Sequence, residues 1–113
     1  MQVIQKQTND VTLLFISGEV TINNTEELTK IIKKIVAGKS RKVLLNLRKL
    51  DYIDSSGLAC FIRFSRDLQK IEGALFFADL PPKIRSIFAI TKLESAFTIY
   101  ESEEEALRGF SGY

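Results

Sequence analysis

The chain has 113 residues, 45% of them hydrophobic and 27% charged, with a formal net charge of +2. This length predicts one domain over residues 1–113, with one hydrophobic core. The absence of histidine excludes histidine-activated nucleophiles and metal sites with histidine ligands. A lone Cys60 excludes a disulfide within the chain, and the small net charge argues against direct nucleic-acid binding. We therefore expect no metal, no cofactor and no enzymatic activity.

The N-terminal sequence shows no charged segment followed by an apolar one, as a secretion signal would. No apolar run approaches the roughly 20 residues that cross a bilayer as a helix. We therefore expect a cytoplasmic protein without a transmembrane segment, monomeric when free.

The first part of the chain predicts a hairpin followed by a helix. Residues 2–8 and 11–17 have the alternation and β-branched content of strands, with turn-forming residues between them. Residues 25–38 place apolar side chains at the three- and four-residue spacing of one helix face. Asn23 and Asn24 precede this helix, and asparagine is favoured at the N-cap.

The remaining elements alternate between strand and helix. They are a strand at 42–47, a turn around Arg48–Asp51, a long helix within 52–73, a strand at 74–78, a helix starting at Pro81–Pro82, a strand at 96–100 and a helix over 102–110. This order predicts an α/β fold: a mixed, largely parallel central sheet opened by an N-terminal β-hairpin, with four helices. In such sheets, ligands and partners meet the carboxyl ends of the strands.

One junction of this kind carries a polar motif, Asp54-Ser55-Ser56-Gly57, at the start of the longest helix. A serine hydroxyl at a helix N-terminus suits phosphorylation, because free backbone N–H groups and the helix dipole stabilise the added charge. Asp54 can orient the Ser55 hydroxyl, and Gly57 can allow another chain to approach closely. The alternative is that these residues only cap the helix, as Asp, Ser and Gly commonly do.

The helix after this motif has more apolar residues than one core-facing stripe needs. Cys60 and Phe64, four residues apart, fall outside the main face. The pattern favours packing in the core, with Cys60 as a small buried hydrophobe. A docking patch for a partner is the alternative.

The chain resembles the STAS domain family, and within it the bacterial anti-sigma factor antagonists. The resemblance spans nearly the whole chain and is carried by Ser17–Val20, Val43–Leu47, Tyr52–Ala59, Gly73–Phe76 and Pro82–Leu93. It implies a STAS-like fold. It also implies phosphorylation by an anti-sigma factor serine kinase of the histidine-kinase-like ATPase fold.

By position, the phosphorylated residue is Ser55, with Ser56 as the alternate. The resemblance implies that the unphosphorylated chain binds the anti-sigma factor and frees a sigma factor, and that a serine phosphatase resets the cycle. An alternative is a STAS scaffold that is not phosphorylated, or an accessory subunit of a signalling or membrane transport complex.

The expected partner-binding surface combines the loop before the first helix with the serine motif. Its residues are Thr21, Asn23, Asn24, Asp54, Ser56, Gly57, Leu58 and Cys60. Thr21 stands where the family usually has an acidic residue. Thr21 can hydrogen-bond in place of that residue, or the loop can suit a divergent partner. Alternatively, Asn24 or Thr25 only caps the first helix.

Overall fold

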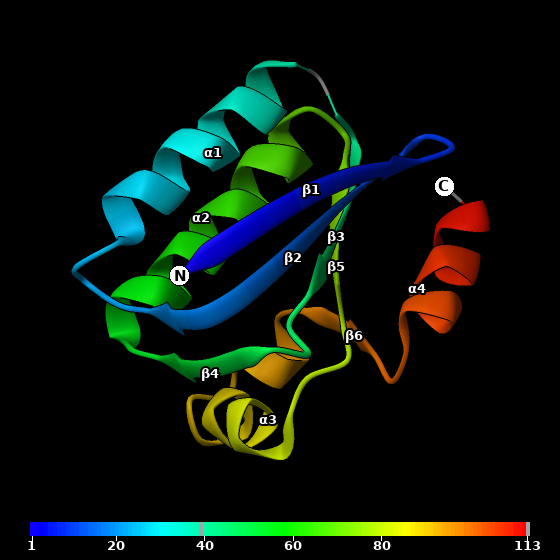
Figure 1. Ribbon diagram of the computed structural model, residues 1–113. Coiled ribbons are helices and arrows are strands. Elements are labelled where there is room, and N and C mark those ends of the chain that lie inside the picture. Colours follow the sequence, from blue (N-terminus) through cyan, green and yellow to red (C-terminus); the bar gives the residue numbers. More distant parts are fainter. Residues whose placement is uncertain (39, 113) are drawn as a thin grey trace.

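The computed structural model describes residues 1–38 and 40–112 (Figure 1). Within them, the elements in chain order are β1 (Gln2–Thr8), β2 (Val11–Val20), α1 (Thr25–Ala37), β3 (Lys42–Asn46), β4 (Leu50–Ile53), α2 (Ser55–Lys70), β5 (Ala74–Ala78), α3 (Pro82–Ile90), β6 (Thr98–Tyr100) and α4 (Glu103–Gly109). Strands β1 and β2 form the predicted hairpin, whose two-residue turn holds Asn9 at a φ of 54°. The mixed α/β fold with four helices is therefore confirmed.

The strands form one sheet in the order β1-β2-β3-β5-β6, with β4 paired to β2 beside this path. Only the β1–β2 pair is antiparallel among the described strands, and the other pairs are parallel. Parallel pairing directs the carboxyl ends of β2, β3, β4, β5 and β6 to one end of the sheet. The start of α2 lies at that end, directly after β4 (Figure 1).

Strand β4 corrects the prediction of a turn around Arg48–Asp51, because Leu50 and Asp51 already belong to the strand. Strand β2 is long enough to pair twice: residues 11–15 pair with β3, and Gly18–Val20 pair with β4, with a bulge between Gly18 and Glu19. Gly18 has a φ of +84°, which a glycine adopts without strain. The four residues of β4 are too few for a clear alternation in the sequence.

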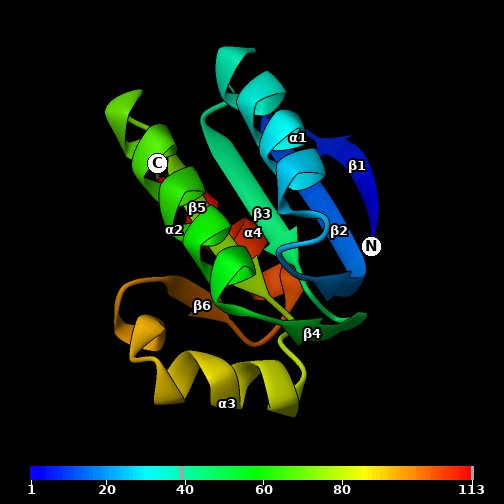
Figure 2. The same ribbon diagram turned by 90° about the vertical axis from the view of Figure 1, so that its left-hand side faces the viewer.

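The helices cover the two faces of the sheet unequally. Helices α1 and α2 lie side by side on one face, α4 lies on the other, and α3 packs at the end near β4 (Figure 2). The larger core lies under α1 and α2, and a smaller cluster that includes Leu44, Phe76 and Phe110 lies under α4. Because α4 has only seven residues and packs on β3, β5 and β6, it leaves β1 and the part of β2 around Phe15 less covered on its face.

Candidate functional site

Asp54 connects the start of α2 to the loop before α1. It is the N-cap of α2, and its Oδ1 accepts a hydrogen bond from the Gly57 N–H at 3.0 Å. Its Oδ2 accepts a second bond from the Ile22 N–H, also at 3.0 Å. The capping interpretation is thus correct for Asp54. The carboxylate also has a role that capping alone does not predict, because it fixes a segment 32 residues away in sequence.

Both bonds favour the charged carboxylate. The Gly57 N–H, and after it the Ile22 N–H, holds the pKa of Asp54 below the ordinary value for an aspartate. A carboxyl whose pKa is lowered by folding stabilises the folded state at pH values above its unfolded pKa. That contribution is lost as the pH falls through the folded pKa.

We therefore expect the amide proton shifts of Ile22 and Gly57 to titrate together in acid, because one carboxylate binds both groups. Their common midpoint, measured by NMR, should lie below the value of about 4 found for aspartate in peptides. In Asp54→Asn, this shared step should vanish. Separate midpoints for the two amides, or a midpoint at the peptide value, would contradict the bridge.

The loop of residues 21–24 is held by its own side chains. Asn24 Oδ1 accepts from the Thr21 N–H at 2.9 Å, and Asn24 Nδ2 donates to the Glu19 carbonyl at 2.8 Å. Thr21 Oγ1 accepts from the Asn23 N–H at 3.3 Å. Asn24 occupies the N-cap position of α1 but makes no side-chain capping bond there. Asn24 is therefore the N-cap by position, as expected, but its side chain shapes the loop instead of capping α1.

The two serines differ in accessibility. Ser55, the first residue of α2, is exposed, whereas Ser56 is half-buried. Asp54 was expected to orient the Ser55 hydroxyl. Its oxygens instead accept hydrogen bonds from the backbone N–H groups of Gly57 and Ile22. The Ser55 hydroxyl thus lies at the surface on a turn whose backbone is fixed from both sides.

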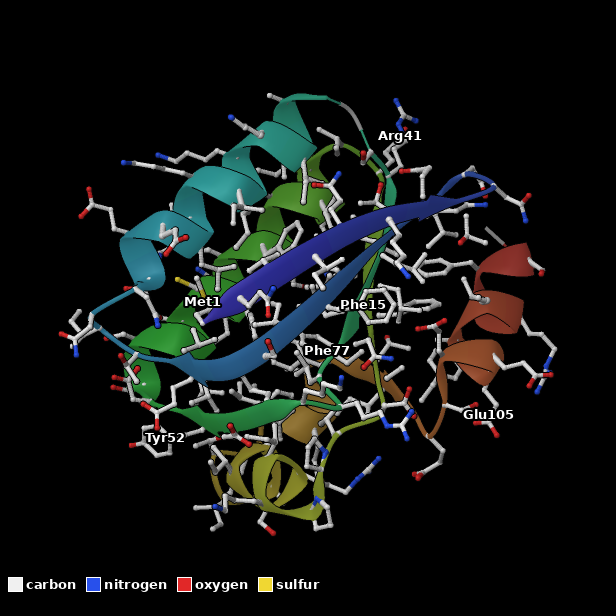
Figure 3. All side chains as sticks on the ribbon, viewed as in Figure 1. Met1, Phe15, Arg41, Tyr52, Phe77 and Glu105 are labelled. Carbon is white, nitrogen blue, oxygen red and sulfur yellow. The ribbon has the colours of Figure 1, made fainter. Side chains whose placement is uncertain are left out.

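Two large apolar side chains are exposed around this turn. Ile22 is 69% exposed in the loop bonded to Asp54, and Tyr52, which precedes Ser55 by three residues, is 45% exposed (Figure 3). Exposed residues of this kind next to polar groups are typical of protein-binding surfaces. Neither residue was predicted from the sequence to belong to the site. An isoleucine among polar loop residues was the only available signal for Ile22.

Three residues expected to contact a partner lie below the surface. Gly57 is buried, and a Cβ on it would lie 2.6 Å from Ile53 Cγ1 and 2.9 Å from Val20 Cγ1. The close approach that we expected at Gly57 is therefore made by the chain itself. Leu58 is 7% exposed and belongs to the core. Both residues support the turn from beneath.

Cys60 is the third of these residues, and its burial argues against the expected contact with a partner. It is 1% exposed and Phe64 is 0% exposed, so the core interpretation is correct and the docking patch is not. Cys60 Sγ lies 3.6 Å from Thr29 Oγ1, because α2 packs against α1 there. The exposed part of the candidate site is formed by Thr21–Asn24, Tyr52 and Asp54–Ser56.

No cluster of three or more His, Cys, Asp or Glu side chains able to hold a metal ion occurs within residues 1–38 and 40–112. The helices in that part of the chain are each too short or too polar to cross a membrane.

The family model for the STAS domain matches residues 2–106, and the chain belongs to this family. The resemblance found in the sequence is thereby confirmed. BtrV of Bordetella bronchiseptica, which carries the name of an anti-sigma factor antagonist, is 29% identical over 110 residues. This match covers 97% of this chain and 95% of BtrV. An anti-sigma-B factor antagonist of Staphylococcus aureus is 25% identical over 89 residues, which cover 79% of this chain and 82% of that protein.

Solved structures share the fold. The unphosphorylated form of the Bacillus anti-sigma factor antagonist SpoIIAA matches with a TM-score of 0.77 and 19% identity, over 99% of this chain and 100% of that one. Its phosphorylated form matches with a TM-score of 0.73 and 20% identity, over 96% and 99%. The murine anion transporter Slc26a9 matches with a TM-score of 0.76 and 12% identity. That match covers 96% of this chain but only 19% of the transporter.

Proposed function

We propose that this chain is an anti-sigma factor antagonist that is switched off by phosphorylation of Ser55. In the unphosphorylated state it binds an anti-sigma factor that is also a serine kinase, and so regulates sigma-factor-dependent transcription in the cytoplasm. The observation that carries the proposal is an exposed serine at the N-terminus of α2, on a turn fixed by Asp54 to the loop before α1. The names of the STAS relatives support the same function.

In this proposal the chain is a substrate, and the partner supplies the chemistry. The kinase transfers the γ-phosphoryl group of ATP to Ser55 Oγ, the serine loses its proton, and ADP leaves. Both Asp54 oxygens accept backbone N–H groups, so we assign to Asp54 the positioning of the turn and to the kinase the general base. A serine phosphatase returns the chain to its binding state.

Phosphate changes the surface through charge. It adds about −1.5 to −2 charges at pH 7, directly beside the Asp54 carboxylate and the exposed Ile22. A partner surface that fits Ile22 and Tyr52 is apolar at those contacts, so a phosphate buried there loses water without gaining a cationic partner. The complex therefore dissociates without any change of fold.

Ile22 is expected to anchor the complex. Replacing Ile22 with Thr should weaken anti-sigma factor binding by about tenfold, because the variant buries less apolar surface against the partner. The Ile22→Thr variant should have the same melting temperature as the wild-type chain, because Ile22 is 69% exposed. Isothermal titration calorimetry measures the affinity.

Ile4→Thr provides the matched control, because Ile4 is also exposed but lies on β1, facing the side of the sheet away from α1 and α2. Equal losses of affinity in the two variants, or no loss in Ile22→Thr, would show that Ile22 does not contact the anti-sigma factor.

The transporter match favours one alternative function. The fold also occurs as part of a larger protein, because the match to Slc26a9 covers 19% of that transporter. An accessory or scaffold role would retain the fold without phosphorylation, and Thr21 in place of the family's acidic residue is consistent with it. Incubation with the kinase and ATP separates the two functions, because only the switch predicts a phosphate on the peptide that contains residues 54–57.

A further inference from the structure

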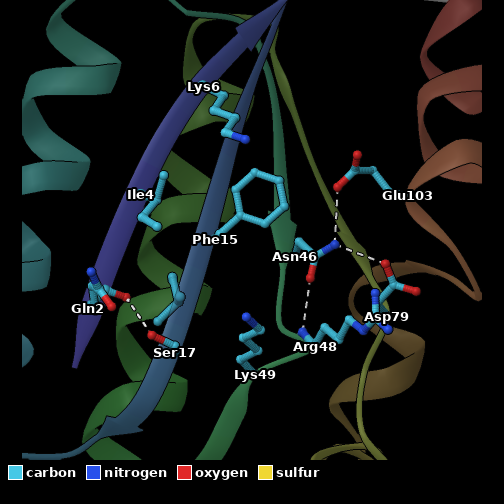
Figure 4. Close-up of a pocket in the computed structure, with 11 residues that line it drawn as sticks. Gln2, Ile4, Lys6, Phe15, Ser17, Asn46, Arg48, Lys49, Asp79 and Glu103 are labelled. Carbon is cyan, nitrogen blue, oxygen red and sulfur yellow. Dashed lines mark hydrogen bonds between the residues drawn. The ribbon is translucent and has the colours of Figure 1, made fainter.

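A pocket on the sheet lies away from the serine turn. Its volume is about 440 Å³, and it lies on the face of the sheet that carries α4, between the β1–β2 hairpin and the start of α4 (Figure 4). Volumes in this range accommodate small organic ligands. None of the exposed residues of the candidate site lines it.

The floor of this pocket is apolar because α4 leaves part of the sheet uncovered. Ile4 on β1 is directly opposite Phe15 on β2, and Phe15 is opposite Asn46 on β3. Ile4 remains 47% exposed and Phe15 half-buried. An aromatic ring and a branched side chain thus form a continuous surface on which a flat apolar ligand can pack.

One wall of the pocket is rigid and fully hydrogen-bonded. Asn46 is 6% exposed, and its Nδ2 donates to Asp79 Oδ2 at 2.9 Å and to Glu103 Oε1 at 3.1 Å. Its Oδ1 accepts from the Arg48 N–H at 3.0 Å. Both carboxylates on this wall therefore accept a hydrogen bond from within the chain. Glu103 also lies in the first turn of α4, where a negative charge is favoured.

The cationic side chains that line the pocket are Lys6, Arg48 and Lys49. The ion pairs within residues 1–38 and 40–112 are Lys42–Asp10, Arg85–Glu101 and Arg108–Glu104, so none involves Lys6, Arg48 or Lys49. Lys6 Nζ lies over the Phe15 ring in a cation–π contact, 5.5 Å from the ring centre, and Lys49 also lines the pocket. An anionic group lying against Phe15 would meet one of these ammonium groups.

We propose that this pocket binds a small aromatic carboxylate. The ring of the ligand packs on Phe15 and Ile4, and its carboxylate pairs with Lys6 or Lys49. The inference does not depend on the proposed function of the serine turn, because it uses different residues on another part of the surface.

The test is an NMR titration of the isotope-labelled chain with indole-3-acetate as the probe. Saturable shifts are expected at the amides of Ile4, Phe15, Ser17 and Asn46. Acetate, which lacks the ring, and tryptamine, which carries the opposite charge on a similar ring, should not saturate these shifts. Phe15→Leu should weaken binding of indole-3-acetate, since the stacking surface is lost while the sheet position stays apolar.

Charge is tested with matched double variants. Lys6→Gln combined with Lys49→Gln should weaken indole-3-acetate binding by about tenfold. Lys33→Gln combined with Lys83→Gln removes the same charge from exposed positions on α1 and α3 and should leave the affinity unchanged. The proposal is overturned if indole-3-acetate fails to saturate the pocket amides, if tryptamine binds equally well, or if the two double variants lose affinity equally.

Discussion

Ser55→Asp is expected to weaken binding to the anti-sigma factor by about 100-fold or more, whereas Ser55→Ala should bind as tightly as wild type. The aspartate places a permanent charge at the centre of the proposed surface, and a buried charge without a partner costs several kcal/mol. The alanine removes only an exposed hydroxyl. The anti-sigma factor is first isolated from source cells with the wild-type chain as bait. Calorimetry with this purified partner then measures both affinities.

Stability controls are built into this comparison. Ser55 is the first residue of α2, where an acidic side chain is favoured by the helix dipole, so Ser55→Asp should melt no lower than wild type. A loss of binding therefore cannot be attributed to unfolding. Wild-type affinity in Ser55→Asp would show that a charge at this position does not control the complex.

Gly57→Ala is expected to destabilise the fold by about 1–3 kcal/mol, as overpacking of a filled core does. The new Cβ would lie 2.6 Å from Ile53 Cγ1 and 2.9 Å from both Val20 Cγ1 and the Val20 carbonyl oxygen. Those atoms are buried, and one belongs to the backbone of β2, so the helix must move. Thermal unfolding should show a melting temperature lower by roughly 5–10 °C.

Gly38→Ala is the matched control, because Gly38 is exposed at the end of α1 with a φ of −75°. The atom nearest to a new Cβ there would be the Lys34 carbonyl oxygen, at 3.3 Å. The Gly38→Ala variant should melt close to wild type. Movement of α2 in Gly57→Ala should also lengthen the bond between Asp54 and Ile22, and so weaken partner binding. Equal melting temperatures for the two variants would contradict the tight packing at Gly57.

Local patterns in the sequence were sufficient to predict most of the fold. The hairpin, the helix before residue 38 and the buried strands at 42–46 and 74–78 follow from periodicity and turn residues, which act within a few positions. Strand β4 could not be predicted in this way. Its partner is the end of β2, some 30 residues earlier, and its exposed Asp51 and Tyr52 hide the alternation.

The position of the site in the chain could be predicted, but the contacts that join it to other segments could not. The serine motif was located, and Asp54 was identified as a possible cap. Its second bond, to the Ile22 N–H, joins segments that only the folded sheet brings together. The burial of Cys60 likewise depends on how α2 packs on α1, which a single helix pattern cannot decide. The open sheet face around Phe15 is apparent only once the short length of α4 is known.

Phosphorylation of the chain by its own partner tests the central claim most directly. The wild-type chain, Ser55→Ala and Ser56→Ala are each incubated with the recovered anti-sigma factor and ATP, and the products are measured by intact and peptide mass spectrometry. The proposed switch predicts one phosphate on Ser55 in the wild-type chain, an unchanged gain in Ser56→Ala and no gain in Ser55→Ala. No phosphate on the wild-type chain, or a phosphate that persists in Ser55→Ala, would contradict it.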